Sequence, residues 1–258
     1  RASARTANAA VGNKRNATLL ENVGGLTMTA LAETVVCVTG ADADVTVGGR
    51  PAPLATPTIV PAGAEVAVKP ARLGFRTYVA VRGGLIADTE LDSAAPDMRS
   101  GLGPKPLAAG DTIAMSLTPP QSANSLLTNP LRVERDGADV VGVVRCVLGP
   151  RDDWFDADAV DRFFNTTFTV TGDSNRVGLR LESDAPLTRS RDGELPSEGM
   201  VAGSVQIPPS GQPVLFLRDH AVTGGYPVIA TVINEDVDIA AQLPPGGKLR
   251  FERYTLEG

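Results

Sequence analysis

The sequence has little histidine and little cysteine, and it has no long apolar run. Histidine occurs once, at His220, which excludes a histidine-rich metal site. The two cysteines, Cys37 and Cys146, lie in apolar, strand-like runs without zinc-ligand spacing, so we expect buried and reduced thiols. No segment approaches the roughly 18 apolar residues that a membrane-spanning helix needs. We therefore expect no bound metal ion and no membrane partner.

Motifs for nucleotides, nucleic acids and hydrolytic nucleophiles are also missing. The formal net charge is −6 and basic residues do not cluster, which disfavours nucleic acid as a partner. The sequence has no GxxxxGK[ST] phosphate loop, no GxGxxG helix entry and no GxSxG nucleophile elbow. A Ser-His-Asp triad could use only His220, whose immediate neighbour is Asp219, so we discount a triad.

Glycine and proline are abundant, with 27 and 20 residues, which favours many short strands joined by turns. Two segments are typical of short helices. One covers residues 4–11 and ends at Gly12 or Asn13, and the other runs through Asn165 from an N-cap at Asp156. We therefore expect an all-β protein with a few short helices.

A weak internal repeat indicates two related halves. An apolar residue, a Pro/Ala-x-Gly turn and a new strand recur twice on each side of residues 116–129, a segment typical of a linker or long loop. We predict β-barrel-like halves at residues 1–130 and 131–258, although generic hairpins produce the same pattern. Because Arg1 opens in mid-pattern, we expect the native N-terminus to be incomplete. The repeats lie at residues 60–66, 107–113, 207–214 and 243–249.

The stretch at residues 197–233 predicts three strands with polar groups at their ends. Apolar runs cover residues 200–207, 213–217 and 228–233, and Arg218-Asp219-His220 and Thr223-Gly224-Gly225-Tyr226 lie between the last two. Loop groups held by a rigid sheet commonly form sites. The alternative is that Gly224-Gly225 is only a tight turn and Asp219 a turn or cap residue.

Arginine side chains and glycine-loop amides are suited to binding a carboxylate, carbamate or carboxyphosphate. Paired acids could move a proton. The alternative for the arginines is solvation or pairing on a surface turn, and residues 39–42 and 82–84 would be counterparts in the first half. We predict Asp219 and Glu198 as catalytic residues, and as substrate-binding residues Arg176, Arg180, Ser197, Gln206, Thr223, Gly224, Gly225 and Tyr226.

Six stretches resemble one known family. They are VTGADADVTVGGRPAP at 38–53, RTYVAVRGG at 76–84, GPRDDWF at 149–155, SNRVGLRL at 174–181, SEGMVAGSVQIPPSGQP at 197–213 and TGGYPVIATV at 223–232. The sequence resembles the allophanate hydrolase subunit 2 family, which is also called KipA-like and includes the C subunit of 5-oxoprolinase. That family is related to the carboxyltransferase half of biotin-dependent urea carboxylase.

The resemblance implies a cytoplasmic protein built of two cyclophilin-like β-barrels that works with a KipI-like sister protein, allophanate hydrolase subunit 1. It implies ATP-dependent amide processing or carboxyl transfer on a small amide such as 5-oxoproline or a urea-like substrate. This chain would bind no cofactor itself, and ATP or biotin would come through partner subunits. The alternative is a non-catalytic regulatory module that binds and antagonises a KipI-like kinase inhibitor.

Three departures from the family pattern bear on the site. No VQDxGRxG-like segment precedes Arg1, and Ser93-Ala94-Ala95 stands where members often carry Ser-Arg-Ser. Many members have another residue at the place of His220, so we do not assign His220 as an essential base.

Overall fold

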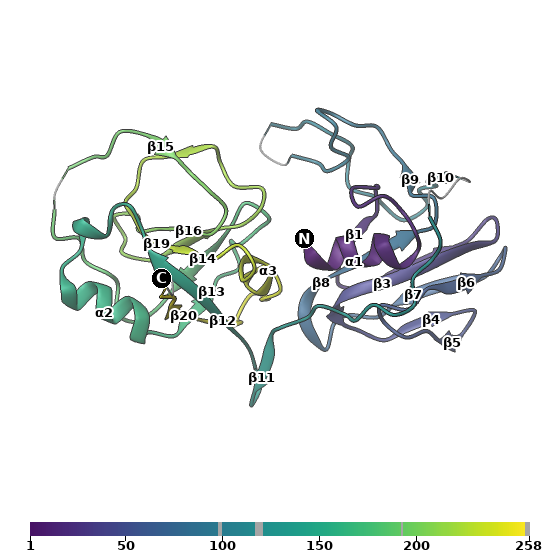
Figure 1. The fold of residues 1–258 in the computed structure, drawn as a ribbon, viewed down its shortest axis with the longest axis horizontal. Coiled ribbons are helices and arrows are strands. Elements are labelled where there is room, and N and C mark those ends of the chain that lie inside the picture. The colour runs from purple at the N-terminus through teal and green to yellow at the C-terminus, as the bar shows by residue number, and fades with distance from the viewer. Residues whose placement is uncertain (98–99, 117–120, 192, 256–258) are drawn as a thin grey trace. The chain divides into compact units, whose positions relative to one another are not determined.

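The computed structural model describes residues 1–97, 100–116, 121–191 and 193–255. The chain forms two compact units, one of Arg1–Arg72 and Arg76–Pro130 and the other of Leu73–Phe75 and Leu131–Gly258 (Figure 1). Strands dominate both units, which confirms the predicted fold class, while the assignment of residues 1–130 and 131–258 as separate domains stays a prediction. Within the described ranges, no helix has the length and apolar character needed to cross a membrane.

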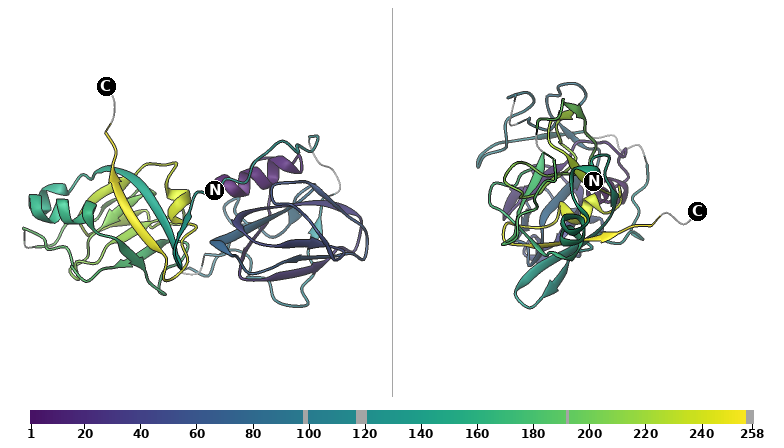
Figure 2. Two further views of the ribbon diagram at one scale, coloured as in Figure 1. Left: turned by 90° about the horizontal axis from the view of Figure 1, so that it is seen from below. Right: turned by 90° about the vertical axis from the view of Figure 1, so that its left-hand side faces the viewer.

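The second unit is organised around strands that close into a barrel. Around the barrel, each strand is hydrogen-bonded to the next in the order β12-β19-β16-β17-β14-β13-β20. Strand β20 then pairs in parallel with β12, which closes the barrel. Figure 2 shows this barrel from two further directions. The strands are β11 (Glu134–Asp136), β12 (Asp139–Leu148), β13 (Phe168–Val170), β14 (Gly178–Glu182), β16 (Ser204–Gln206), β17 (Val214–Phe216), β19 (Val228–Val232) and β20 (Lys248–Arg253), beside a ribbon of β15 (Glu198–Gly199) and β18 (Thr223–Gly224).

Alternation of side chains along each strand fills the barrel with apolar groups. In β14, Leu179 and Leu181 are buried and Arg180 is exposed, as the period of two in a strand requires. Helix α2 (Ala157–Asn165) adds Phe163, whose ring lies 4.4 Å from that of Phe251. The short helices η1 (Asp152–Trp154) and α3 (Val237–Ala240) complete the unit.

The cap predicted for α2 is confirmed. Asp156 accepts a hydrogen bond of 2.7 Å from the backbone N–H of Ala159, which satisfies one of the donors that a helix N-terminus leaves free. The helix ends at Asn165, as expected.

In the described residues of the first unit there are two four-stranded sheets, a two-stranded ribbon and one helix. The sheet orders are β1-β8-β3-β6 and β2-β7-β4-β5, and valines from both sheets form one core. Helix α1 packs its alanines around the buried Cys37. The elements are α1 (Ala2–Ala10), β1 (Leu20–Val23), β2 (Leu26–Thr29), β3 (Thr34–Asp42), β4 (Val45–Val47), β5 (Arg50–Pro51), β6 (Thr58–Val60), β7 (Glu65–Val68), β8 (Leu73–Val81), β9 (Leu85–Ile86) and β10 (Ala114–Met115).

Both cysteines are buried free thiols, as predicted. Burial raises the pKa of Cys37 and of Cys146 to about 12, although the charge of Arg253 acts in the opposite direction on Cys146. A thiol with so high a pKa is a poor nucleophile at neutral pH.

One local prediction was wrong in detail. The strand expected over residues 200–207 is only Ser204–Gln206, because Gly203 has a φ of 96° and forms a turn before it. The segment predicted as a linker or long loop has no helix or strand over residues 121–129, and it packs on the first unit, where the N–H groups of Gln121 and Asn124 donate to carbonyls at the end of α1. Residues 117–120 of that segment lie outside the described part of the chain.

Candidate active site

The β15–β18 ribbon brings two predicted segments together. The strands are antiparallel, with Glu198 opposite Gly224 and Gly199 opposite Thr223. Ser197 directly precedes this pair, and β15 lies near the top of the second unit in Figure 1. Four of the predicted site residues therefore share one small surface: Ser197, Glu198, Thr223 and Gly224. In the chain, strands β16 and β17 lie between the two segments.

Gln206 explains why glycine occupies position 224. Its buried side chain on β16 donates to the carbonyl of Tyr226 at 3.0 Å and lies 3.4 Å from the sulfur of Met200. A Cβ atom on Gly224 would lie 2.5 Å from Nε2 of Gln206. Close approach of this amide, rather than a left-handed backbone, requires the glycine.

Glu198 is held by an arginine that the sequence analysis did not assign. Nε of Arg151 donates to Glu198 at 3.1 Å, and Nη2 bonds the second carboxylate oxygen. The Arg151 hydrogen bonds lower the pKa of Glu198 despite the opposing effect of partial burial, and the same pair raises the pKa of Arg151. The ionised Glu198 carboxylate is suited to holding the ribbon in place through Arg151. The role of Glu198 in proton transfer stays a prediction.

Asp219 and Arg176 contact each other directly. Nε of Arg176 lies 3.3 Å from Oδ2 of Asp219, and both side chains remain about a third exposed or more. Arg180 is exposed on the outer face of β14, and its backbone N–H donates to the hydroxyl of Ser174 at 2.9 Å. Solvent-accessible Asp219 can therefore reach a ligand, while Arg176 already carries a counter-ion.

His220 does not form an acid–base pair with its neighbour. Nδ1 of His220 lies 2.8 Å from the carbonyl of Ala221, and the ring is 6.3 Å from that of Phe216. The absence of His220 from the catalytic set stays a prediction.

The proposed counterparts in the first unit make contacts that support its fold. Thr39 donates to the carbonyl of Ser3 at 2.8 Å, and Gly40 exchanges two hydrogen bonds with Asn129. Arg82 and Gly83 bond groups around the end of α1. A ligand would have to displace these contacts, so we place the candidate site in the second unit.

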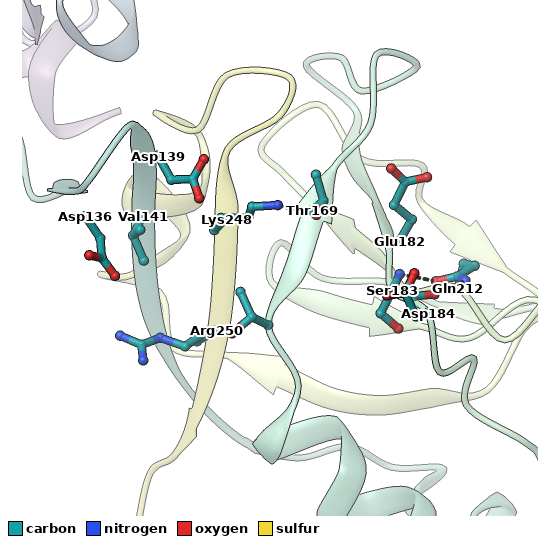
Figure 3. Close-up of a pocket in the computed structure, with 11 residues that line it drawn as sticks. Asp136, Asp139, Val141, Thr169, Glu182, Ser183, Asp184, Gln212, Lys248 and Arg250 are labelled. Atoms are coloured by element: carbon teal, nitrogen blue, oxygen red, sulfur yellow. Dashed lines mark hydrogen bonds between the residues drawn. The ribbon is translucent and has the colours of Figure 1, made fainter.

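A groove of ≈480 Å³ lies on another face of the barrel. Asp136 and Asp139 lie on one side and Asp184 on the other, and Lys248 donates to Thr169 on its floor (Figure 3). None of the predicted site residues lines it. We retain the ribbon as the candidate site because its groups match the expected chemistry, whereas the groove is lined by a mixture of acidic, basic and uncharged side chains and by none of the residues predicted for the site. In the described part of the chain, no cluster of His, Cys, Asp or Glu has the makings of a metal site.

Comparisons with known proteins agree with the fold and identify its family. Residues 1–253 match the family described as carboxyltransferase domain, subdomain A and B. The chain is 31% identical, over 98% of its length, to the C subunit of 5-oxoprolinase from Escherichia coli (strain K12), of which it covers 80%.

Solved structures show the same fold. The crystal structure of TTHA0988 is 33% identical with a TM-score of 0.81; the match includes 97% of this chain and 48% of that one, about half its length. The K. lactis urea amidolyase has a TM-score of 0.85 at 23% identity, with 98% of this chain and 16% of that one covered, so that likeness concerns the fold alone. The resemblance found in the sequence is confirmed, and the chain belongs to the carboxyltransferase domain family, subdomains A and B.

Proposed function

We propose that this chain is the counterpart of the C subunit in a 5-oxoprolinase-type enzyme and is inactive without its partners. The observation that carries the proposal is the 31% identity to the E. coli protein over 98% of this chain. The name of that relative indicates a multi-subunit enzyme. For this chain we propose a KipI-like sister subunit, a cytoplasmic location and ATP-dependent opening of a small cyclic amide.

The candidate site supports a division of labour among its side chains. Asp219 is exposed enough to exchange a proton with a bound amide, and Arg176 keeps its carboxylate oriented at 3.3 Å. The Arg151–Glu198 pair joins the ribbon to the chain that leaves β12. Gln206, packed against Gly224, fixes the loop that carries Gly225 and Tyr226.

ATP would act through partner subunits in this proposal. The chain has no GxxxxGK[ST] loop to cradle phosphates. Biotin would enter in the same way if the reaction were carboxyl transfer, as in the urea carboxylase relatives. The chain's own contribution is to bind and orient the amide and to handle one proton.

Reconstitution tests the proposal. The full-length protein is mixed with its neighbouring subunits, and turnover of 5-oxo-L-proline with ATP is compared with that of each subunit alone. We expect activity only in the mixture. An assembled but inactive mixture, when urea with carboxybiotin also fails, would favour the regulatory module that binds a KipI-like protein.

A further inference from the structure

Arg189, in the loop between β14 and β15, has few partners for its charge. A guanidinium carries five N–H donors, and here Nη2 donates to the carbonyl of Ile207 at 2.5 Å. Cζ of Arg189 lies 5.7 Å from the ring centroid of Tyr226. Nε is buried and has no acceptor among the described residues. Buried donors in native proteins are nearly always satisfied, so this one indicates a missing acceptor.

The neighbouring arginines of the second unit differ from Arg189 in having carboxylate partners. Arg151 pairs with Glu198 and Arg176 with Asp219. No carboxylate in the described ranges pairs with Arg189, and desolvation lowers its pKa. A partly buried cation without a counter-ion costs free energy, which a bound anion would offset.

The Arg189 guanidinium, which has no carboxylate partner among the described residues, lies beside the candidate site. It lies over the ring of Tyr226, a residue that directly follows Gly224-Gly225 and whose carbonyl accepts a hydrogen bond from Gln206. In the described structure, the backbone N–H groups of Gly225 and Tyr226 make no hydrogen bond within the chain. A guanidinium presents a planar fork of N–H donors that suits a carboxylate, and backbone N–H groups can add further donors to the same anion.

We propose that Arg189, which lies over the ring of Tyr226, binds the carboxylate of a small substrate at the Gly224-Gly225 loop. The inference rests on the proposed function and assigns the residue that recognises the carboxylate of its cyclic amide substrate. It assigns anion binding to Arg189 rather than to Arg176, which is paired with Asp219, or to Arg180 on the outer face of β14. A substrate without a carboxylate, such as urea, would leave Arg189 uncompensated.

Two ligands that differ only in the carboxylate test the proposal. Calorimetric titration of the assembled complex compares 5-oxo-L-proline with pyrrolidin-2-one, the same lactam without its carboxylate. We expect 5-oxo-L-proline to bind about 10- to 100-fold more tightly, the range for hydrogen bonds to a charged group. Arg189→Gln should abolish this preference, and Arg189→Lys should reduce it, because a lysine keeps the charge and loses the fork.

The matched control is Arg162→Gln, which removes one positive charge from the exposed face of α2. It should keep the full preference for 5-oxo-L-proline. Equal affinities for the two lactams in the wild type, including no binding of either, would overturn the proposal, as would an Arg189→Gln protein that keeps the preference. If circular dichroism shows Arg189→Gln to be unfolded, Arg189→Lys takes its place. An Arg189→Lys protein that keeps the full preference for 5-oxo-L-proline would then overturn the proposal.

The binding assay separates this inference from the proposed function. A complex that turns over 5-oxo-L-proline, with a carboxylate preference that ignores Arg189, would retain the function and refute the inference. A complex without turnover that shows an Arg189-dependent preference would retain the inference about carboxylate binding and refute the proposed function.

Discussion

Replacing Asp236 by asparagine should destabilise the second unit more than any surface ion-pair substitution. The Asp236 carboxylate is buried and accepts hydrogen bonds from the backbone N–H of Arg145 at 2.9 Å, from its Nε at 2.8 Å and from its Nη2 at 2.9 Å. Nη1 of Arg132 adds a fourth at 3.2 Å. Together these contacts hold β12 against the start of α3.

The magnitude follows from what the substitution leaves behind. Breaking a fully buried ion pair costs about 3–5 kcal/mol, but both arginines are close to half exposed and can be rehydrated. We therefore expect Asp236→Asn to lose about 2–3 kcal/mol in free energy of unfolding, close to the value for hydrogen bonds to a charged group. Urea denaturation followed by the fluorescence of Trp154, the one tryptophan in the sequence, measures this loss.

The pH dependence gives a second signature. Burial alone would raise the pKa of Asp236, but the hydrogen bonds from Arg145 and the charges of Arg145 and Arg132 outweigh it and lower the pKa. The stabilisation is then fully present above the unfolded value of about 3.9 and is lost as the pH falls through the lower folded value. The difference between wild type and Asp236→Asn should therefore shrink below about pH 4.

Asp161→Asn is the control, because Asp161 pairs with Arg253 at 3.0 Å on the exposed surface. Pairs of this kind contribute about 0–1 kcal/mol. If Asp236→Asn lost no more stability than Asp161→Asn, the reasoning about the buried carboxylate would be refuted.

Two further predictions concern the ribbon. Gly224→Ala should cost about 1–3 kcal/mol, as overpacking does, because its Cβ would meet Gln206 at 2.5 Å; Gly199→Ala on the facing strand, with nothing within 4 Å, should be nearly neutral in the same urea experiment. Arg151→Met and Glu198→Gln should each reduce the activity of the complex, and the double variant should lose little more than either alone, since both remove one contact. Additive losses in this double-mutant cycle would show that the two side chains act independently.

Local features of the fold could be predicted from the sequence. The cap at Asp156 and the end of α2 at Asn165 depend on neighbouring residues, and both were predicted. Closure of the barrel joins β12 to β20, which are about one hundred residues apart in the chain. No local pattern carries that parallel pairing, so the sequence indicated two barrel-like halves without the order of their strands.

The candidate site likewise has residues that the sequence predicted and contacts that it did not. Ser197, Glu198, Thr223 and Gly224 stood out because polar and glycine residues follow apolar runs, and the ribbon joins them. Arg151 lies 47 residues from Glu198 in the chain. Among the described residues, Arg189 has no carboxylate partner, whereas Arg151 has one. Such differences depend on tertiary contacts, which the spacing of residues in the sequence does not encode.

The most direct measurement is kcat/KM for 5-oxo-L-proline in the reconstituted complex carrying Asp219→Asn. Loss of a general acid or base typically costs about 10²- to 10⁴-fold in rate, and we expect a fall of at least about 100-fold while the subunits still assemble. Asp158→Asn, an exposed carboxylate on α2, should leave the rate unchanged. Full activity of the Asp219→Asn complex would contradict the assignment of Asp219 as the catalytic acid or base.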